Sequence, residues 1–206
     1  MNPAHDLDLD FDSPPSDPVA LIEAWVDAAS ASGQYPNPSA MTLATVDAKG
    51  APAARVVLMR GFDEAGICFF TNYDSPKSLA LATNDRCALV FHWDHHQRQL
   101  RIEGRASRTS DAESDAYWNT RPRESQLAAC ASAQSAVVGS RAALANEFLE
   151  LKDKLGDTNV PRPSNWGGFR VSLDVIEFWQ GQPARLHDRL RYTRGEHGWV
   201  TSLLWP

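Results

Sequence analysis

The chain has 206 residues, of which 43% are hydrophobic, and it carries a formal net charge of -6 at pH 7. A chain of this length can bury roughly 70% of the surface that its unfolded form exposes, which is enough for one domain with a sizeable core. The charge gives no basic field for nucleic acid, and no apolar run approaches the ~20 residues of a membrane-spanning helix. We therefore expect neither nucleic acid nor a membrane as a partner.

The chain begins with an acidic stretch. Residues 1–20 contain five aspartates and no lysine or arginine, so the rest of the chain is nearly neutral. Residues 1–15 alternate Asp with Leu or Phe before a Ser-Pro-Pro sequence, which predicts a disordered, solvated tail that folding does not need. This stretch also lacks the basic-then-apolar layout of a signal peptide. Residues 16–206 are expected to form a single domain.

The first elements after the tail are a helix and a run of strands. Ser16 to Pro18 has the composition of a helix start, and Gly33 is expected to end that helix. Short alternating runs bounded by turn residues then predict strands at Met41–Val46, Ala53–Arg60, Ile67–Thr71, Arg86–Trp93 and Arg98–Arg108. Gly61–Gly66 is expected to be a turn, and a short helix is expected from Asp74 to about Thr83.

Helices dominate the next third of the chain. Ser110 and Glu113 have the spacing of a capping box, and a stripe of Leu and Phe from Leu144 to Leu155 predicts a helix that ends at Gly156. Strands return from Gly168 to the end, and a hairpin turn is expected at Gly195–Gly198. The fold class expected is mainly β with α additions, built on a β-barrel.

Three cysteines bear on the compartment. Cys68, Cys87 and Cys130 are odd in number and widely spaced. This argues against a disulfide framework or a zinc ribbon and fits a reducing cytoplasm.

Two groups of residues have the chemistry to bind phosphate. The first is Arg55 with Ser75 and Lys77 at a helix start, where free backbone N–H groups favour an anion. An ordinary capped surface helix is the alternative, and the residues alone favour it about two to one.

The second group is Tyr117, Arg121 and Ser125, spaced four residues apart. Pro122 disfavours helical dihedrals at Arg121, so the helix is expected to break there while the three side chains converge across the bend. A polar turn between two helices is the alternative.

The stretch from Arg185 to Arg189 is the most informative part of the chain. If it is extended, Arg185, His187 and Arg189 line one face, and Leu186 and Leu190 line the other. Two guanidinium groups beside an imidazole repel each other unless an anion or an electron-rich ligand lies there. A solvated polar strand face is about equally consistent with these residues.

The remaining polar and aromatic candidates are weaker. Gln99 lies on an expected strand and can hydrogen-bond an amide-like ring edge, and Gln134 and Ser135 form a polar pair. Trp179 can pack on an aromatic ligand, although a lone Trp in a strand is more often core. The residues from His92 to His96 do not have the spacing of a metal site, so no metal is expected.

The chain resembles the pyridoxamine 5'-phosphate oxidase family from about Pro18 to Pro206. The resemblance rests on ordered motifs, which are Arg55–Leu58, Phe70–Asn72, Arg98-Gln99, Arg121–Gln126, Gln134-Ser135, Trp166–Arg170, Ile176–Trp179 and Arg185–Arg189. It implies an FMN-binding split β-barrel that works as a homodimer with FMN at the subunit interface.

The resemblance also implies roles for individual residues. Those implied to bind the cofactor are Arg55, Val56, Val57, Leu58, Phe70, Thr71, Lys77, Gln99, Gln134, Ser135, Trp179 and Arg189. Those implied to bind the substrate are Arg60, Tyr117, Arg121 and Ser125 at its phosphate and Arg185 and His187, the implied catalytic pair, at its reacting end. The implied reaction is oxidation of pyridoxamine and pyridoxine 5'-phosphates to pyridoxal 5'-phosphate, with oxygen as acceptor and hydrogen peroxide released.

Three departures from the family pattern concern substrate affinity. Arg60 stands where the family usually has Lys, Pro76 stands where it often has Arg, and the two termini lack basic residues found in some members. The alternatives are a related FMN oxidase of aromatic secondary metabolism, of the phenazine type, and a non-catalytic FMN or pyridoxal 5'-phosphate binding protein.

Overall fold

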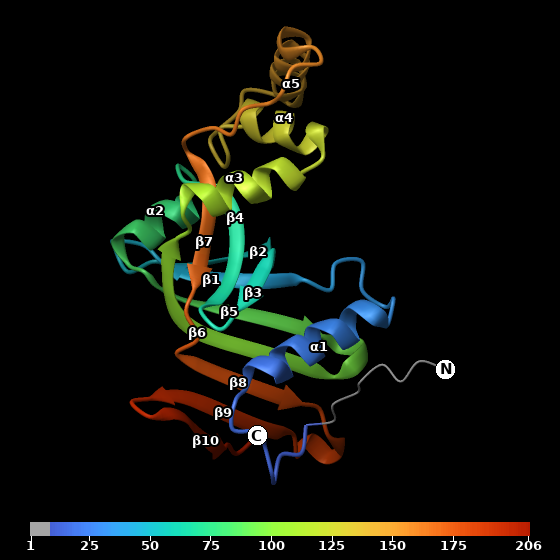
Figure 1. The fold of residues 1–206 in the computed structure, drawn as a ribbon, viewed down its shortest axis with the longest axis vertical. Helices are drawn as coiled ribbons and strands as arrows, with labels where there is room; N and C mark the ends of the chain where they lie inside the picture. Colours follow the sequence, from blue (N-terminus) through green and yellow to red (C-terminus); the bar gives the residue numbers. More distant parts are fainter. Residues whose placement is uncertain (1–8) are drawn as a thin grey trace.

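A computed structural model describes residues 9–206, and Figure 1 shows that strands form most of its body while the helices of residues 111–155 gather at one end. The helices are α1 (Val19–Ala31), α2 (Pro76–Thr83), α3 (Asp111–Thr120), α4 (Arg123–Ala131) and α5 (Arg141–Leu155), with short 3-10 turns η1 (Asp94–His96) and η2 (Pro183–Arg185). The strands are β1 (Ala40–Val46), β2 (Pro52–Leu58), β3 (Gly61–Asp63), β4 (Gly66–Asn72), β5 (Arg86–Trp93), β6 (Arg98–Arg108), β7 (Trp166–Val171), β8 (Val175–Gln180), β9 (Asp188–Gly195) and β10 (Gly198–Leu203).

All strand pairs are antiparallel, and the long strand β6 belongs to both parts of the sheet. The main path runs β10-β9-β8-β6-β5-β1-β2, and β3, β4 and β7 branch from it. The first part of β6, through Glu103, pairs with β8, and its last part, from Ala106, pairs with β7. Gly104 lies at this change of partner, where an added Cβ would stand 1.9 Å from the carbonyl oxygen of Ser172. The two halves of the sheet therefore diverge at a residue that must be glycine.

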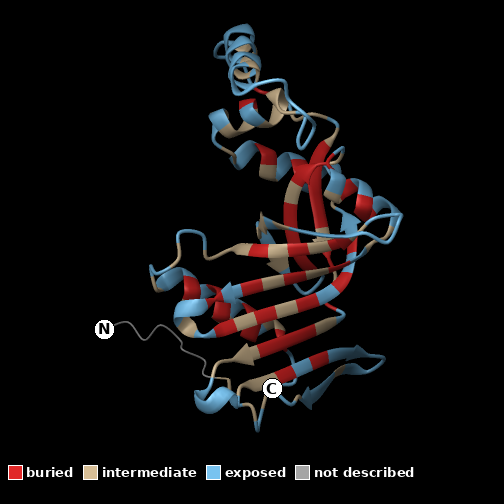
Figure 2. Ribbon diagram, turned by 180° about the vertical axis from the view of Figure 1, so that it is seen from behind, coloured by how far each residue is buried: buried red, intermediate tan, exposed pale blue. Residues whose placement is uncertain are grey.

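Helix α1 covers one face of the sheet and closes the larger core. Along β5, buried residues alternate with more exposed ones, as Figure 2 shows for the central strands, because successive side chains point to opposite faces. Ile22 and Trp25 of α1 are buried against this face, and the Trp25 ring meets Phe178 edge-on at 5.0 Å. The predicted helix is thus confirmed as an amphipathic cover, although it spans Val19–Ala31 and its N-cap is Pro18, without the predicted side-chain cap.

A second, smaller core lies under the helices at the other end. It consists of Trp118, Leu127, Val160 and Trp166. Helix α5 contributes only partly buried side chains to it, among them Phe148 and Leu151. The predicted stripe on this helix is confirmed as a packing face, although Leu144 is exposed.

The predicted elements need three adjustments. The strand expected over Ala53–Arg60 ends at Leu58, and the expected turn at Gly61–Gly66 contains β3, which pairs with β4. The last group of strands begins at Trp166 rather than at Gly168. Short strands of this kind depend on a neighbour in the sheet rather than on their own sequence pattern.

The predicted tail is only partly covered by the structure. Residues 1–8 lie outside the described residues, so the prediction of a solvated tail is untested there. Leu9 and Phe11 pack against the larger core, and the Tyr192 hydroxyl donates a hydrogen bond to the Pro15 carbonyl at 2.9 Å. Residues 9–15 therefore contact the body instead of extending into solvent.

Candidate functional site

A cavity of about 490 Å³ lies between the strands β2 and β4 and the helices α2, α3 and α4. Its lining residues are Val56, Val57, Leu58, Arg60, Phe70, Thr71, Asn72, Lys77, Tyr117, Arg121, Ser125, Ala128, Ala129, Ser132, Gln134 and Trp166. One cavity thus brings Lys77 of the first predicted phosphate group to all three residues of the second, Tyr117, Arg121 and Ser125, although the groups lie about 40 residues apart in the chain. Among these lining residues there is no carboxylate, so the charged groups of the wall are all cationic.

One cationic side chain of the wall is Lys77, at the first turn of α2. Its ammonium donates to Gln134 Oε1 at 2.7 Å, and to Thr71 Oγ1 and Ser75 Oγ at 3.0 Å. Burial, with a smaller contribution from the nearby charge of Arg55, lowers the pKa of Lys77 to about 8. All three partners are uncharged oxygens, so an anionic ligand would supply the negative partner that this ammonium lacks.

Two of the predicted cofactor residues lie beside the cavity rather than on it. Arg55 turns toward β1, where its Nη1 donates to Leu43 O at 3.1 Å and to Thr45 Oγ1 at 2.8 Å. Ser135 lines an adjoining cavity of about 470 Å³, which shares Gln134 with the first. The predicted donor Ser75 is buried and its hydroxyl already donates to Asn72 O at 2.7 Å, so its role here is to hold Lys77.

The other end of the cavity is formed around Arg121. Its backbone is extended (φ -74°, ψ 142°) because Pro122 follows, and this confirms the predicted break between α3 and α4. The guanidinium carbon lies 5.0 Å from the Trp118 ring centroid and 4.7 Å from that of Trp166. The Nη1 atom is buried and has no hydrogen-bond partner. A buried, unsatisfied cationic donor at a cavity wall fits a phosphate oxygen.

Three aromatic rings line the space beside Arg121. The rings of Phe70 and Tyr117 are stacked with centroids 4.1 Å apart, and those of Tyr117 and Trp166 are inclined by only 8° at 6.2 Å. Flat walls of this kind fit a planar ring, which is the chemistry of a pyridine or a flavin. Trp166 was given no role from the sequence, because a Trp at a strand start is ordinarily core.

The remaining predicted residues form a second group on the main sheet. Gln99 pairs in register with Trp179, and Trp179 with Arg189, so the three lie in a row across β6, β8 and β9. Arg189 donates to the buried carboxylate of Glu177 through Nε and Nη2, and to Trp205 O through Nη1. Glu177 was missed because a Glu within a strand is more often a solvated residue.

The two groups do not meet within one subunit. Strand β9 is five strands from β2 along the sheet, which is roughly 24 Å at ~4.8 Å per strand. Figure 1 shows β8 and β9 at the opposite end of the molecule from α3 and α4, so a ligand the size of a substituted pyridine in the cavity does not reach Arg185 or His187 of the same chain.

The prediction that Arg185–Arg189 is extended is wrong for its first part. Pro183 begins a 3-10 turn, closed by a hydrogen bond from Leu186 N to Pro183 O at 3.2 Å, and Arg185 adopts a left-handed φ of 62°. Strand β9 starts only at Asp188. Alternation of faces therefore does not apply, and Leu186 is exposed rather than buried.

His187 is nevertheless fixed within this turn. Its Nδ1 accepts a hydrogen bond from the Gln182 backbone N–H at 3.0 Å, and its ring lies 4.6 Å from that of Trp179. With Nδ1 as acceptor, the neutral imidazole carries its proton on Nε2. His187 thus presents a donor beside the row of Gln99, Trp179 and Arg189.

Within residues 9–206, no helix is long and apolar enough to cross a membrane. In the same part of the chain, no three His, Cys, Asp or Glu side chains gather as metal ligands. Within the histidine-rich stretch His92–His96, the Nδ1 atom of His96 lies 2.9 Å from the Tyr35 hydroxyl.

The fold and the cavity define a split-barrel protein with a cationic, aromatic-walled site. A family model described as pyridoxamine 5'-phosphate oxidase matches residues 29–154, and one described as the pyridoxine 5'-phosphate oxidase C-terminal dimerisation region matches residues 166–206. The chain belongs to the pyridoxamine 5'-phosphate oxidase family, an oxidase family, as the sequence motifs predict.

Similar proteins cover nearly the whole chain. A pyridoxine/pyridoxamine 5'-phosphate oxidase of Cupriavidus necator is 51% identical over 85% of this chain and 82% of its own. One of Burkholderia multivorans is 50% identical over 92% of this chain and 89% of its own. The structure of PhzG from Burkholderia lata, in complex with tetrahydrophenazine-1-carboxylic acid, is 31% identical with a TM-score of 0.89, covering 95% and 96% of the two chains. An FMN-binding protein of Nostoc punctiforme, at 18% identity and a TM-score of 0.69, shares the fold.

Proposed function

We propose that the protein is an FMN-dependent pyridoxine/pyridoxamine 5'-phosphate oxidase that acts as a homodimer. The observation that carries the proposal is the cavity wall at Arg121, where a buried guanidinium Nη1 without a partner lies beside stacked aromatic rings. This combination suits a ligand that carries a phosphate ester on an aromatic ring's side arm. Relatives that are 50–51% identical are named pyridoxine/pyridoxamine 5'-phosphate oxidases.

The cofactor residues in this proposal fall into two sets. Lys77, Thr71 and Gln134 already form a polar cluster on the cavity wall that can hold the FMN phosphate and ribityl chain, with Arg55 adding positive charge nearby. Arg55 and Ser135 are assigned to the same ligand from the family motifs. The others assigned to the cofactor are Val56, Val57, Leu58, Phe70, Gln99, Trp179 and Arg189.

Bound FMN would accept the electrons of the substrate and pass them to oxygen, which is released as hydrogen peroxide. The protein's own residues bind and orient. Tyr117, Arg121 and Ser125 would hold the substrate phosphate, with Arg60 on the same wall. Arg185 and His187 would hold the reacting end, where the Nε2–H of His187 can donate a hydrogen bond that orients the substrate's amine nitrogen or alcohol oxygen.

A homodimer follows from the separation of the two residue groups. Because they lie roughly 24 Å apart along one sheet, both can contact one substrate only if the second group comes from another copy. In a two-fold dimer each copy would supply its second group to the other's cavity, so that two equivalent sites form. The match of residues 166–206 to a dimerisation region supports this arrangement.

Light scattering of the purified protein tests the dimer. We expect twice the chain mass of 22.7 kDa at micromolar concentration. A particle of 22.7 kDa that binds FMN and turns over would contradict a shared site.

An oxidase of the phenazine type is the second candidate, because PhzG matches over almost the entire chain. The intact set of Tyr117, Arg121 and Ser125 at the cavity favours a phosphorylated substrate instead. The deciding experiment measures FMN-supported peroxide formation from pyridoxine and pyridoxamine 5'-phosphates and from their unphosphorylated forms. Equal rates with both forms would overturn the proposed substrate, and binding of the vitamers without peroxide would indicate a binding protein.

A further inference from the structure

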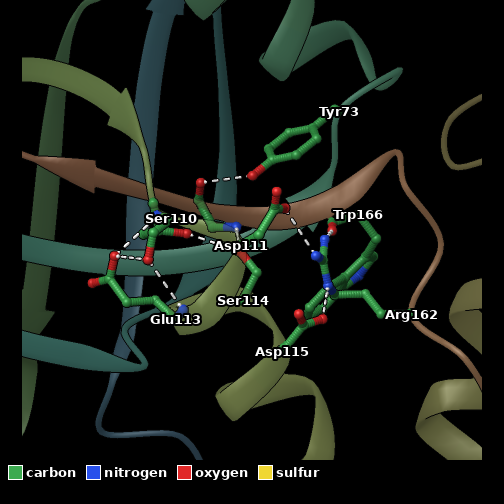
Figure 3. Close-up of polar contacts among 10 residues, drawn as sticks. Tyr73, Ser110, Asp111, Glu113, Ser114, Asp115, Arg162 and Trp166 are labelled. Carbon is green, nitrogen blue, oxygen red and sulfur yellow. Dashed lines mark hydrogen bonds and ion pairs between the residues drawn. The ribbon is translucent and has the colours of Figure 1, made fainter.

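Arg162 links helix α3 to the start of strand β7. Its Nε donates to Asp115 Oδ1 at 2.5 Å, its Nη2 to Asp111 Oδ1 at 2.9 Å, and its Nη1 to Trp166 O at 2.7 Å. Figure 3 shows the side chain lying between these three acceptors, with only 11% of it exposed. Every nitrogen of the guanidinium is thus used to join one helix to one strand.

The two linked elements carry the wall of the cavity. Tyr117 follows Asp115 by two residues on α3, and Trp166 is the first residue of β7. The near-parallel rings of Tyr117 and Trp166, and the position of Arg121 over Trp166, both depend on how α3 lies against β7. We propose that Arg162 is a positioning residue that sets this geometry and thereby determines affinity for the phosphate of the substrate.

Other contacts keep α3 attached to the same loop and strand, so loss of Arg162 can shift the helix but does not detach it. Trp118 donates from Nε1 to Val160 O at 2.9 Å, which ties the helix to the same loop. An added Cβ at Gly167 would stand 2.9 Å from Ser114 Oγ, so helix and strand are in close contact. Asp111 and Asp115 lie one turn apart on α3 and repel each other unless a cation stands between them.

The same geometry argues against a purely stabilising role. Asp111 is 93% exposed and Asp115 is 58% exposed, and ion pairs with exposed carboxylates contribute little to stability. Loss of Arg162 should therefore leave the fold intact while the helix shifts. A shift of α3 at the wall of the binding site changes reaction rates and substrate affinity far more than it changes stability.

The inference rests on the proposed oxidase function, and the experiment compares Arg162→Met and Arg162→Lys with Arg105→Met. Arg105 forms an ion pair with Asp85 at 2.8 Å on the main sheet and contacts no lining residue of the cavity. Three quantities are measured on the FMN-loaded protein: steady-state constants for pyridoxine 5'-phosphate, its equilibrium binding by tryptophan fluorescence under anaerobic conditions after the FMN has been chemically reduced so that no turnover occurs, and the melting temperature.

We expect Arg162→Met to raise both KM and Kd for pyridoxine 5'-phosphate roughly tenfold, with kcat within about twofold of wild type. Affinity for unphosphorylated pyridoxine should fall much less, because it lacks the phosphate that Arg121 contacts. Arg162→Lys keeps a cation that can reach some of the acceptors, so its KM and Kd should lie between those of wild type and Arg162→Met. Arg105→Met should match wild type. In an Arg121→Ala background, Arg162→Met should add little, because both changes act on one phosphate contact.

Several outcomes would overturn the inference. A lower melting temperature with an unchanged KM, or an equal loss of affinity for pyridoxine with and without phosphate, would assign Arg162 a structural role only. If Arg162→Met does not fold, Asp115→Ala removes the acceptor of one of the three contacts and must raise KM for the phosphorylated substrate more than for the unphosphorylated one. A wild-type protein that does not prefer phosphorylated vitamers would refute the proposed function itself, whereas a normal preference with no difference between Arg162→Met and Arg105→Met would refute only this inference.

Discussion

The guanidinium of Arg121 lies over the indole ring of Trp166, 4.7 Å from its centroid, with one buried nitrogen left without a hydrogen-bond partner. Burial lowers the pKa of Arg121 from its ordinary value, and this is the cost of keeping a cation in a half-buried position. A site that holds a charge in this way is prepared for a charge of opposite sign.

Replacing Arg121 by Ala should weaken substrate binding much more than cofactor binding. The lost contact is a charge-assisted hydrogen bond worth roughly 1.5–3 kcal/mol, so KM for both phosphorylated vitamers should rise by ~10–100-fold. Steady-state assays and an FMN titration of the same variant separate the two effects. An unchanged KM would show that the substrate phosphate binds elsewhere.

Binding of FMN should depend on the protonation of Lys77. Its pKa is lowered to about 8, mainly by burial, so the free protein loses this cation as the pH rises through 8. An anionic ligand favours the protonated amine, and FMN affinity should therefore be full below pH 7 and fall toward pH 9. Fluorescence titrations at intervals of half a pH unit measure the effect. Lys77→Arg should remain charged and give a flat profile, and a wild-type profile that is equally flat would exclude Lys77 from the phosphate site.

The His187→Ala variant should lose turnover and keep FMN. The ring is positioned by the Gln182 N–H and by Trp179, so its Nε2 proton points to a defined place, and loss of a positioned donor lowers kcat by ~100-fold or more. His197, exposed in the hairpin between β9 and β10, provides the matched control through His197→Ala. A kcat that falls equally in both variants would point to general damage rather than to catalysis.

Two truncations should behave differently. Starting the chain at Leu9 should leave the melting temperature unchanged, because residues 1–8 are predicted from their sequence to be solvated. Starting it at Ser16 removes Leu9, Phe11 and the hydrogen bond from Tyr192 to Pro15, so the melting temperature should drop by roughly 2–4 °C for each kcal/mol lost. Calorimetry of the two proteins makes the comparison, and equal melting temperatures would show that residues 9–15 add no stability.

Local sequence patterns predicted much of the fold because each depends on a few neighbouring residues. The alternation in β5, the capping box at Ser110 and the break imposed by Pro122 are all of this kind, and the structure contains each of them. The four-residue spacing of Tyr117, Arg121 and Ser125 allowed them to converge across this break, and all three line the cavity.

The features that sequence analysis missed depend on partners distant in the chain. Strand β3 exists because β4 pairs with it, and Trp166 became a cavity residue only through its contact with α3. The 3-10 turn at Pro183 was missed because Arg185 and His187 fit an alternating pattern equally well. A residue pattern cannot distinguish a strand from a turn when the side chains are exposed in both.

The distance between the cavity and the second residue group has a consequence for dimers that are assembled from two different variants. An Arg121→Ala subunit lacks a working phosphate wall but still carries an intact His187, and a His187→Ala subunit has the reverse defect. In a mixed dimer, one of the two sites would receive both defects and the other site neither. Two inactive proteins, dissociated and reassociated together in equal amounts, should therefore complement each other and regain roughly one quarter of the wild-type activity.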